Sequence, residues 1–459
     1  MLAAGCSGSS TAAQDAAIRV PVDQFTLDNG LAVILHRDTT SPIIETNIWY
    51  HVGSANEQPG RTGFAHLFEH IMFEGSKNVP EGRIDEWFEE VGGAPNGSTA
   101  PDRTNYMQTF ASNALDMALF IESDRMGWLL DAMSPASVDG QRDVVKNERR
   151  QSYDNRPYGL AGQILNEELF PADHPYHWPV IGYMDDLSAA SYEDVREFFR
   201  RYYAPNNASL VIAGDFEVAE ARRLVDRWFG EIPRGEPVPR LEATLPVRTS
   251  AERVMLEDRV QLPRLVMAWV TPPAYADGNA DLDALADLLA SGKNSRLFKR
   301  LVYELQIADD VSAVNATARL ASQFHITATA RAGHNLAELD SVILEEIDKL
   351  RTAPAEAAEL SRVVNQVEVG FYEGLERIDA KADQLNEYLY HTGEPDFFQR
   401  ELDRLRAVTP ATILAAAERY LDPDTRVVLS IVPEGNTVLA LPESRPIPRE
   451  NIAQSPRAR

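Results

Sequence analysis

The sequence predicts an α+β fold of two homologous domains, each a mostly antiparallel sheet packed with helices. Short runs of alternating apolar residues, typical of half-buried strands, are interleaved with longer stretches of helical periodicity. The same order of elements recurs in the second half of the chain, after a segment containing Pro233, Pro237, Pro239 and Pro246. A chain of 459 residues is long enough for two such domains, each with its own core.

In the first half, Asn29-Gly30 lies between two alternating runs and predicts a strand, a tight turn and a second strand over 24–35. Asp215 ends an apolar run and is a suitable N-cap for the helix that follows. The further elements expected here are strands at 43–52, 96–99, 106–110 and 209–215, and helices around 66–70, 82–91, 114–131 and 137–151, with a last helix ending near 229.

The second half repeats this mixture of strands and helices. We expect strands at 254–257, 264–271, 323–330 and 426–432, and helices at 282–301, 336–351, 355–377, 380–389 and 410–420. The predicted domain organisation is an N-terminal domain at 21–232, a Pro-rich linker at 233–248 and a C-terminal domain at 249–441. Residues 1–20 are expected to be a disordered lead-in or the remnant of a lipoprotein signal, and the Pro- and Arg-rich residues 442–459 a loose tail.

Composition excludes several classes of protein. The net charge of −26 argues against nucleic acid as a partner, because phosphate binding needs basic patches. No apolar run reaches the roughly 18 residues that a membrane helix needs. The chain has a single cysteine, Cys6, so it forms no internal disulfide, and no dinucleotide-binding fingerprint or reactive cysteine supports a redox enzyme.

Cys6 lies in the segment Leu2-Ala3-Ala4-Gly5-Cys6-Ser7, which is similar to the end of a bacterial lipoprotein signal peptide. In such signals the cysteine becomes the lipidated first residue. This similarity predicts a bacterial periplasmic protein, with a lipid on Cys6 as a candidate membrane anchor. A cytoplasmic location is the alternative.

The segment His66-Leu67-Phe68-Glu69-His70 has the H-x-x-E-H pattern of inverted zinc peptidases. Two histidines four residues apart on a helix share one face, so both imidazoles can bind one metal ion. Glu69 lies beside them and could take a proton from a water at the metal. The motif therefore indicates zinc-dependent hydrolysis.

A catalytic zinc ion needs a third protein ligand and one open position. The predicted helix 137–151 offers Glu148 and Asp143, and composition does not choose between them. Gln141 lies seven residues before Glu148 and on the same face, which would let Glu148 ligate the metal while Gln141 supports it.

In combination, several motifs resemble those of the pitrilysin-like, or M16, metallopeptidase family. The closest group is the bacterial two-subunit peptidases related to mitochondrial processing peptidase. The resemblance covers nearly all of residues 20–440 and is carried by Gly63–Gly75, Gly92–Thr99, Thr104–Tyr106, Val144–Arg149 and Tyr202–Ala208.

The resemblance implies a site. His66, His70 and Glu148 would bind Zn²⁺, and Glu69 would be the general base. The family usually has, where this chain has Gln141, a glutamate that supports the metal ligands from behind. The free edge of a strand around Asn96, Gly97, Ser98 and Thr99 would bind an extended peptide as an added strand.

One part of the family pattern is missing. Related chains carry an Arg and a Tyr seven residues apart in a segment like L-R-E-x-x-G-L-A-Y, which grips the substrate. In the corresponding stretch, 301–311, Val302 stands at the Arg position and Asp309 at the Tyr position; Tyr303 is a possible substitute. We therefore expect a heterodimer with a homologous subunit that supplies the pair, a homodimer being less favoured.

Two functions follow from these observations. The first is a zinc endopeptidase subunit that cleaves peptides or unfolded polypeptides. The alternative is a zinc-binding scaffold subunit with little activity unless an Arg/Tyr-bearing partner is present. His174 and His177 form a further histidine pair, but the prolines around them indicate a packed loop instead of a second metal site.

Overall fold

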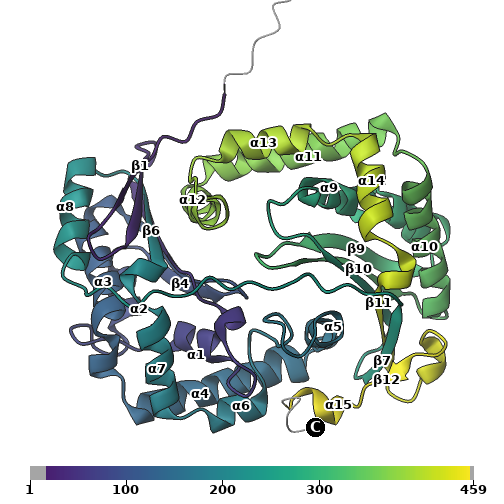
Figure 1. The fold of residues 1–459 in the computed structure, drawn as a ribbon, viewed down its shortest axis with the longest axis horizontal. Coiled ribbons are helices and arrows are strands. Elements are labelled where there is room, and N and C mark those ends of the chain that lie inside the picture. The colour runs from purple at the N-terminus through teal and green to yellow at the C-terminus, as the bar shows by residue number, and fades with distance from the viewer. Residues whose placement is uncertain (1–16, 455–459) are drawn as a thin grey trace, which may run out of the picture.

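The computed structural model describes residues 17–454 and contains two six-stranded sheets, which lie on opposite sides of the molecule in Figure 1. Each sheet has its own large apolar core against helices of its own half. The predicted α+β fold of two similar units is confirmed. Cys6 lies outside the described residues, as does most of the predicted lead-in.

The first sheet has the strand order β1-β2-β6-β3-β5-β4. Its neighbours pair antiparallel except β2 and β6, which are parallel. The outermost strand β4 pairs on one side only, with β5, so its other edge is free. The strand bounds are β1 Asp23–Thr26, β2 Ala32–Arg37, β3 Ile43–Tyr50, β4 Ala94–Thr99, β5 Thr104–Ala111 and β6 Ala208–Gly214.

The second sheet has the order β12-β7-β11-β8-β10-β9. From β7 to β9 it repeats the order of the first sheet from β2 to β4, so β9 is the counterpart of β4. The bounds are β7 Glu252–Asp258, β8 Arg264–Thr271, β9 Ala308–Ala316, β10 Ser322–Ala330, β11 Val427–Pro433 and β12 Arg445–Pro446.

The helices are divided between the two halves. Those of the first half are α1 Phe64–Ile71, α2 Arg83–Glu90, α3 Leu115–Ala132, α4 Pro135–Arg149, α5 Ala161–Leu169, α6 Met184–Ala189, α7 Tyr192–Tyr202 and α8 Val218–Phe229. Those of the second half are α9 Asn279–Ala290, α10 Leu336–Thr352, α11 Ala357–Glu376, α12 Ile378–Thr392, α13 Phe398–Arg406, α14 Pro410–Tyr420 and α15 Arg449–Ile452.

Each half contributes one helix to the sheet of the other half. Helix α12 packs on β3 and β6 of the first sheet, where Leu385 joins an apolar cluster with Ile34 and Val211. Helix α5 packs on β8 and β11 of the second sheet, where Ile164 joins a cluster with Val254. Each sheet is therefore covered partly by a helix from the other half of the chain.

Several predicted elements differ from the structure. The helix expected over 282–301 ends at Ala290, because Gly292 has a positive φ of 75° and a separate helical turn begins at Phe298. Residues 233–248, predicted as a linker, contain no helix or strand.

The prediction of a loose tail at 442–459 is wrong for its described part. Strand β12 pairs with β7, and Ile452 is 1% exposed, because the tail covers an apolar cluster below the second sheet. The prediction of a disordered lead-in is likewise wrong at its end, since the Val20 amide donates to Asp396 and the Val20 side chain is buried.

Candidate metal centre

Helix α1 begins where Gly63 adopts a positive φ of 88°. A Cβ atom there would lie 2.8 Å from the carbonyl oxygen of Ile181, so the close packing requires glycine. The amides of Gly63 and Ala65 donate to the buried carboxylate of Glu57, both at 2.9 Å, which satisfies the free donors at the start of the helix. Glu57 therefore fixes the start of the helix that carries the motif.

The apolar face of α1 packs into the first core, with Leu67 and Phe68 fully buried. This orientation leaves His66, Glu69 and His70 half-buried on the other side of the helix. The helical spacing of the motif thus places all three polar side chains at one surface, as the sequence predicts.

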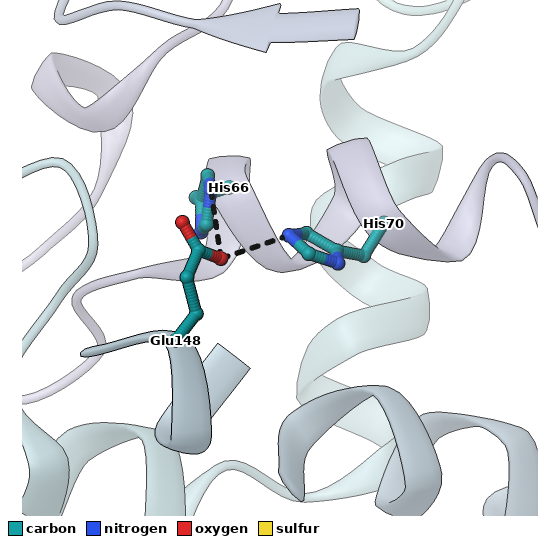
Figure 2. A group of neighbouring side chains, drawn as sticks. All are labelled: His66, His70 and Glu148. Carbon is teal, nitrogen blue, oxygen red and sulfur yellow. Dashed lines mark ion pairs between the residues drawn. The ribbon is translucent and has the colours of Figure 1, made fainter. Parts of the chain in front are cut away.

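Glu148 reaches this surface from α4. Its Oε2 lies 3.2 Å from Nε2 of His70 and 3.7 Å from Nε2 of His66 (Figure 2). One ligand atom from each of the three residues lies within 4.8 Å of the others. Asp143 is exposed and is not in this group, because five residues along a helix correspond to a large rotation about its axis. Of the two alternatives that the sequence leaves open, the structure brings Glu148 to the histidines.

Hydrogen bonding at Glu148 and burial at His66 favour the protonation states that bind metal. A hydrogen bond from His70 holds the pKa of Glu148 below its usual value, and the charge of His66 acts in the same direction. Burial lowers the pKa of His66, although the charges of Glu148 and Glu69 oppose the shift. An ionised carboxylate and a neutral imidazole are the ligand forms that metal binding requires.

This donor set fits zinc. Two imidazole nitrogens and one carboxylate oxygen are a known catalytic zinc set, which leaves one coordination position open. Within the described residues, Nδ1 of His66 is buried without a hydrogen-bond partner. Only Nε2 of that ring therefore faces the other two residues.

Glu69 lies directly against the edge strand β4. The hydroxyl of Thr99 donates to Oε2 of Glu69 at 2.6 Å. A Cβ atom on Gly97 would lie 3.0 Å from Cγ of Glu69 and 3.1 Å from the Phe73 ring, so glycine leaves the room that the carboxylate occupies. The carboxylate and the free strand edge are thus side by side.

The other two residues of the predicted substrate edge have different contacts. The exposed Asn96 accepts a hydrogen bond from the Gly97 amide through its own Oδ1 at 2.9 Å. The Ser98 hydroxyl donates to Asn105 on β5 at 2.6 Å, and Arg103 donates to the Ser98 carbonyl at 2.9 Å. Ser98 and Arg103 therefore brace β4 against β5.

Gln141 does not contact the candidate ligands through its amide nitrogen. That nitrogen donates a hydrogen bond to Glu74, which follows α1 in the chain. Burial raises the pKa of Glu74, and the charge of Glu81 adds to the shift. Gln141 thus joins α4 to the segment after the H-x-x-E-H helix.

The segment expected to hold the Arg/Tyr pair crosses two elements. Val302 lies in the helical turn Phe298–Glu304, and Asp309 lies in β9, where it pairs with Arg331 at 3.2 Å. Gln306 has a positive φ of 56°, at the position where the family pattern has glycine, which supports this placement of the pattern. Tyr303 is 52% exposed.

Sequence reasoning missed two buried groups near the site. Arg149 follows Glu148, is fully buried and donates to the Gly182 carbonyl at 2.7 Å, which holds the end of α4. Its position four residues after the buried Val145 was a usable signal. The second group is Asp102, whose position in a turn gave no indication of burial. His174 and His177 form a packed loop, both being less than a tenth exposed.

The chain combines two similar α+β halves with an H-x-x-E-H helix and a third candidate metal ligand, Glu148. Two sequence models of one family match the chain. The model described as "Insulinase (Peptidase family M16)" matches residues 32–170, and that described as "Peptidase M16 inactive domain" matches residues 189–367. Together they cover more than half of the sequence. The chain belongs to peptidase family M16.

Relatives with curated names agree with this assignment. The chain is 29% identical to "Zinc protease PqqE" of Helicobacter pylori over 390 residues, which are 83% of this chain and 87% of the relative. It is 22% identical to "Mitochondrial-processing peptidase subunit beta" of Blastocladiella emersonii, over 92% of this chain and 91% of the relative.

Solved structures show the same fold. A protease from Helicobacter pylori superposes with a TM-score of 0.86 at 26% identity, covering 91% of this chain and all of that one. The periplasmic protease PqqL from Escherichia coli has a TM-score of 0.74 at 19% identity; the match covers 96% of this chain but 50% of PqqL.

In residues 17–454, no helix has the length and apolar character needed to cross a membrane.

Proposed function

We propose that this chain is the zinc-bearing subunit of an endopeptidase that cleaves peptides or unfolded polypeptides. His66, His70 and Glu148 would hold the metal, and Glu69 would act as the general base. The proposal depends mainly on one observation, the convergence of three potential ligands beside a carboxylate that lies against a free strand edge. Zinc bound there would polarise the scissile carbonyl and make a water more acidic.

The residues of the chain would then act in order. An extended substrate pairs with the free edge of β4, which brings its backbone beside Glu69. The Glu69 carboxylate accepts a proton from the attacking water and passes it to the leaving amine. The Thr99 hydroxyl, bonded to Oε2 of Glu69, holds this carboxylate in place during both transfers.

Substitution of the base tests the proposal. Glu69→Gln keeps the shape of the side chain but removes its basicity, so peptide cleavage should fall by roughly 10²–10⁴-fold. Zinc content and the melting temperature should remain those of the wild type. Glu193→Gln, an exposed change on α7, is a matched control. Cleavage by Glu69→Gln at the wild-type rate would refute the assignment.

We further propose that a homologous subunit supplies the missing Arg and Tyr. The support is that Val302 and Asp309 occupy the corresponding positions in this chain. The alternative function, a zinc-binding scaffold, differs only in what the chain does alone. A peptidase assay separates the endopeptidase from the scaffold. The purified chain is assayed alone and together with a homologous chain of similar length that is encoded by a neighbouring gene. Full activity of the chain alone would contradict both the scaffold and the obligate partner.

We also propose a periplasmic location with a lipid on Cys6, supported by the lipoprotein-like segment around that residue. Metabolic labelling with a palmitate analogue tests this. Wild-type protein expressed in a bacterial host should carry the label, and a Cys6→Ala variant should not. Absence of label from both would contradict the proposed anchor.

A further inference from the structure

Asp102 lies in the turn between β4 and β5 and is buried, with 8% of its surface exposed. Its two carboxylate oxygens accept the Tyr176 hydroxyl at 2.7 and 2.6 Å. One of them also accepts the backbone N–H of Arg319 at 2.8 Å, and the Arg319 guanidinium lies 4.0 Å from the other. Tyr176 belongs to the first half, whereas Arg319 lies between β9 and β10 of the second half.

The same turn is held through its backbone. The Tyr390 hydroxyl, on α12, donates to the carbonyl of Asp102 at 3.0 Å. The amide of Ala55 donates to the carbonyl of Pro101 at 2.8 Å. Four separate segments, two from each half, therefore converge on one four-residue turn.

This turn is continuous with the substrate edge. Thr99, the last residue of β4, lies three positions before Asp102 and bonds to Glu69 at 2.6 Å. The Ala100 amide closes the turn by donating to the carbonyl of Arg103 at 2.8 Å. A displacement of the turn would move the Thr99 hydroxyl, and a shift of about 1 Å in a catalytic group can cost a hundredfold in rate.

A buried carboxylate is costly unless its oxygens are hydrogen-bonded. Burial raises the pKa of Asp102, whereas the Tyr176 hydroxyl and the Arg319 amide lower it. Apolar packing alone could hold the two halves together without a buried carboxylate. A hydrogen-bonded carboxylate adds direction, because it fixes where the turn lies with respect to both halves.

We propose that Asp102 is a positioning residue for the peptidase reaction, and that the second half holds the base Glu69 in place through Arg319, Tyr390 and the β4–β5 turn. The inference depends on the proposed function, since it assigns a role relative to Glu69. The C-terminal half thus takes part in the reaction even though it lacks the Arg/Tyr pair.

The test uses variants that remove single polar groups; the Tyr176 hydroxyl also accepts the Leu320 amide at 2.9 Å. Tyr176→Phe and Tyr390→Phe each delete one hydroxyl, and Asp102→Asn removes the charge. Each should lower kcat about tenfold or more, with a smaller change in KM and full zinc content. Asp258→Asn is the matched control, since Asp258 is 1% exposed and also joins the halves, bonding to Tyr158 and Arg449. It should lower thermal stability but leave kcat unchanged.

Coupling to Thr99 separates positioning from general stability. If Tyr176 acts through Thr99, the double variant Tyr176→Phe/Thr99→Val should lose little more kcat than Thr99→Val alone. Additive losses of kcat would overturn the inference. So would an Asp258→Asn variant that loses kcat in proportion to its stability.

Hydrogen exchange gives a readout that does not need activity. The backbone amide hydrogens of residues 94–99 should exchange at least about tenfold faster in Asp102→Asn and Tyr176→Phe than in the wild type. In Asp258→Asn they should exchange at the wild-type rate. Unchanged exchange in the first two variants refutes the positioning role. If instead the wild type shows no hydrolysis with or without a partner, the proposed function fails while the exchange data still decide whether Asp102 positions β4.

Discussion

The Glu69 carboxylate has room beside β4 because Gly97 has no side chain. The position has no positive φ, so its glycine is not needed for a turn; it is needed for space beside Glu69 and Phe73. Residue propensities carry no information about such a requirement for space. Only the tertiary contact with α1 explains it.

Gly97→Ala is therefore expected to reduce activity without unfolding the chain. The added methyl would lie 3.0 Å from Cγ of Glu69, so the Glu69 side chain, which is hydrogen-bonded to Thr99, must shift by a few tenths of an ångström. We expect kcat/KM to fall by about ten- to a hundredfold, the loss typical of a small displacement of a catalytic group. Gly92→Ala, at a site with nothing within 4 Å but a positive φ of 72°, should cost stability and not activity. Peptide hydrolysis and thermal unfolding together distinguish the two.

A second residue-scale prediction concerns acid stability. Burial lowers the pKa of His325, on β10, to about 4, whereas an unfolded histidine titrates near 6.5. The unfolded state then binds the proton more tightly, so stability from neutral His325 is present above pH 6.5 and is lost as the pH falls towards 4. His325→Gln should flatten the dependence of the unfolding free energy on pH in this window. The unfolding free energies of the wild type and the variant are measured by urea titration at pH 4.5 and pH 7. An equal difference between the two pH values in both proteins would contradict the prediction.

At the scale of elements, the sequence predicted most helices and strands that have a strong period, including β2, α1, α4 and β10. It missed β9, the helices α5, α6, α7 and α13, and the short elements β12 and α15. Strand β9 contains Asp309, Asp310 and Asn315, residues that disfavour strands, and its order comes from pairing with β10. The two histidines of the candidate site were predictable because one helix fixes their spacing. From the residues alone Glu148 was one of two alternatives, and the position of Asp102 depends on four distant segments.

Helix α12 gives a prediction about the join between the halves. Asn386 is fully buried, accepts the Ser209 hydroxyl at 2.7 Å and donates to the Asn47 carbonyl at 2.9 Å. Asn386→Leu would remove both hydrogen bonds and leave the Ser209 hydroxyl with His51 alone, so the unfolding free energy should fall by about 0.5–1.5 kcal/mol for each hydrogen bond lost. Asn365→Leu, on the neighbouring helix α11 and outside this core, is the control. Equal denaturant midpoints for the two variants would refute this role.

At the scale of the whole molecule, the exchange of α5 and α12 makes the two sheets interdependent. Neither half buries its sheet with its own helices alone, since the cluster around Ile34 needs α12 and the cluster around Val254 needs α5. The chain should therefore unfold as one unit, although it contains two similar folds.

A cut in residues 233–248 tests this interdependence. A protease site inserted there should yield two fragments that still elute together in size-exclusion chromatography and still unfold in a single transition. The reason is that the contacts between the halves are made by packed helices and do not require the connecting segment to be intact. Separate elution of the fragments would show that the halves are independent.

The shared cores also set the order of events during synthesis. When the first sheet leaves the ribosome, the face formed by Ile34 and Val211 has no cover, because α12 is made only after β7 to β10 and α9 to α11. The nascent N-terminal half exposes this apolar surface until then. Chaperones that bind such surfaces would therefore have a long interval in which to act before α12 covers the sheet.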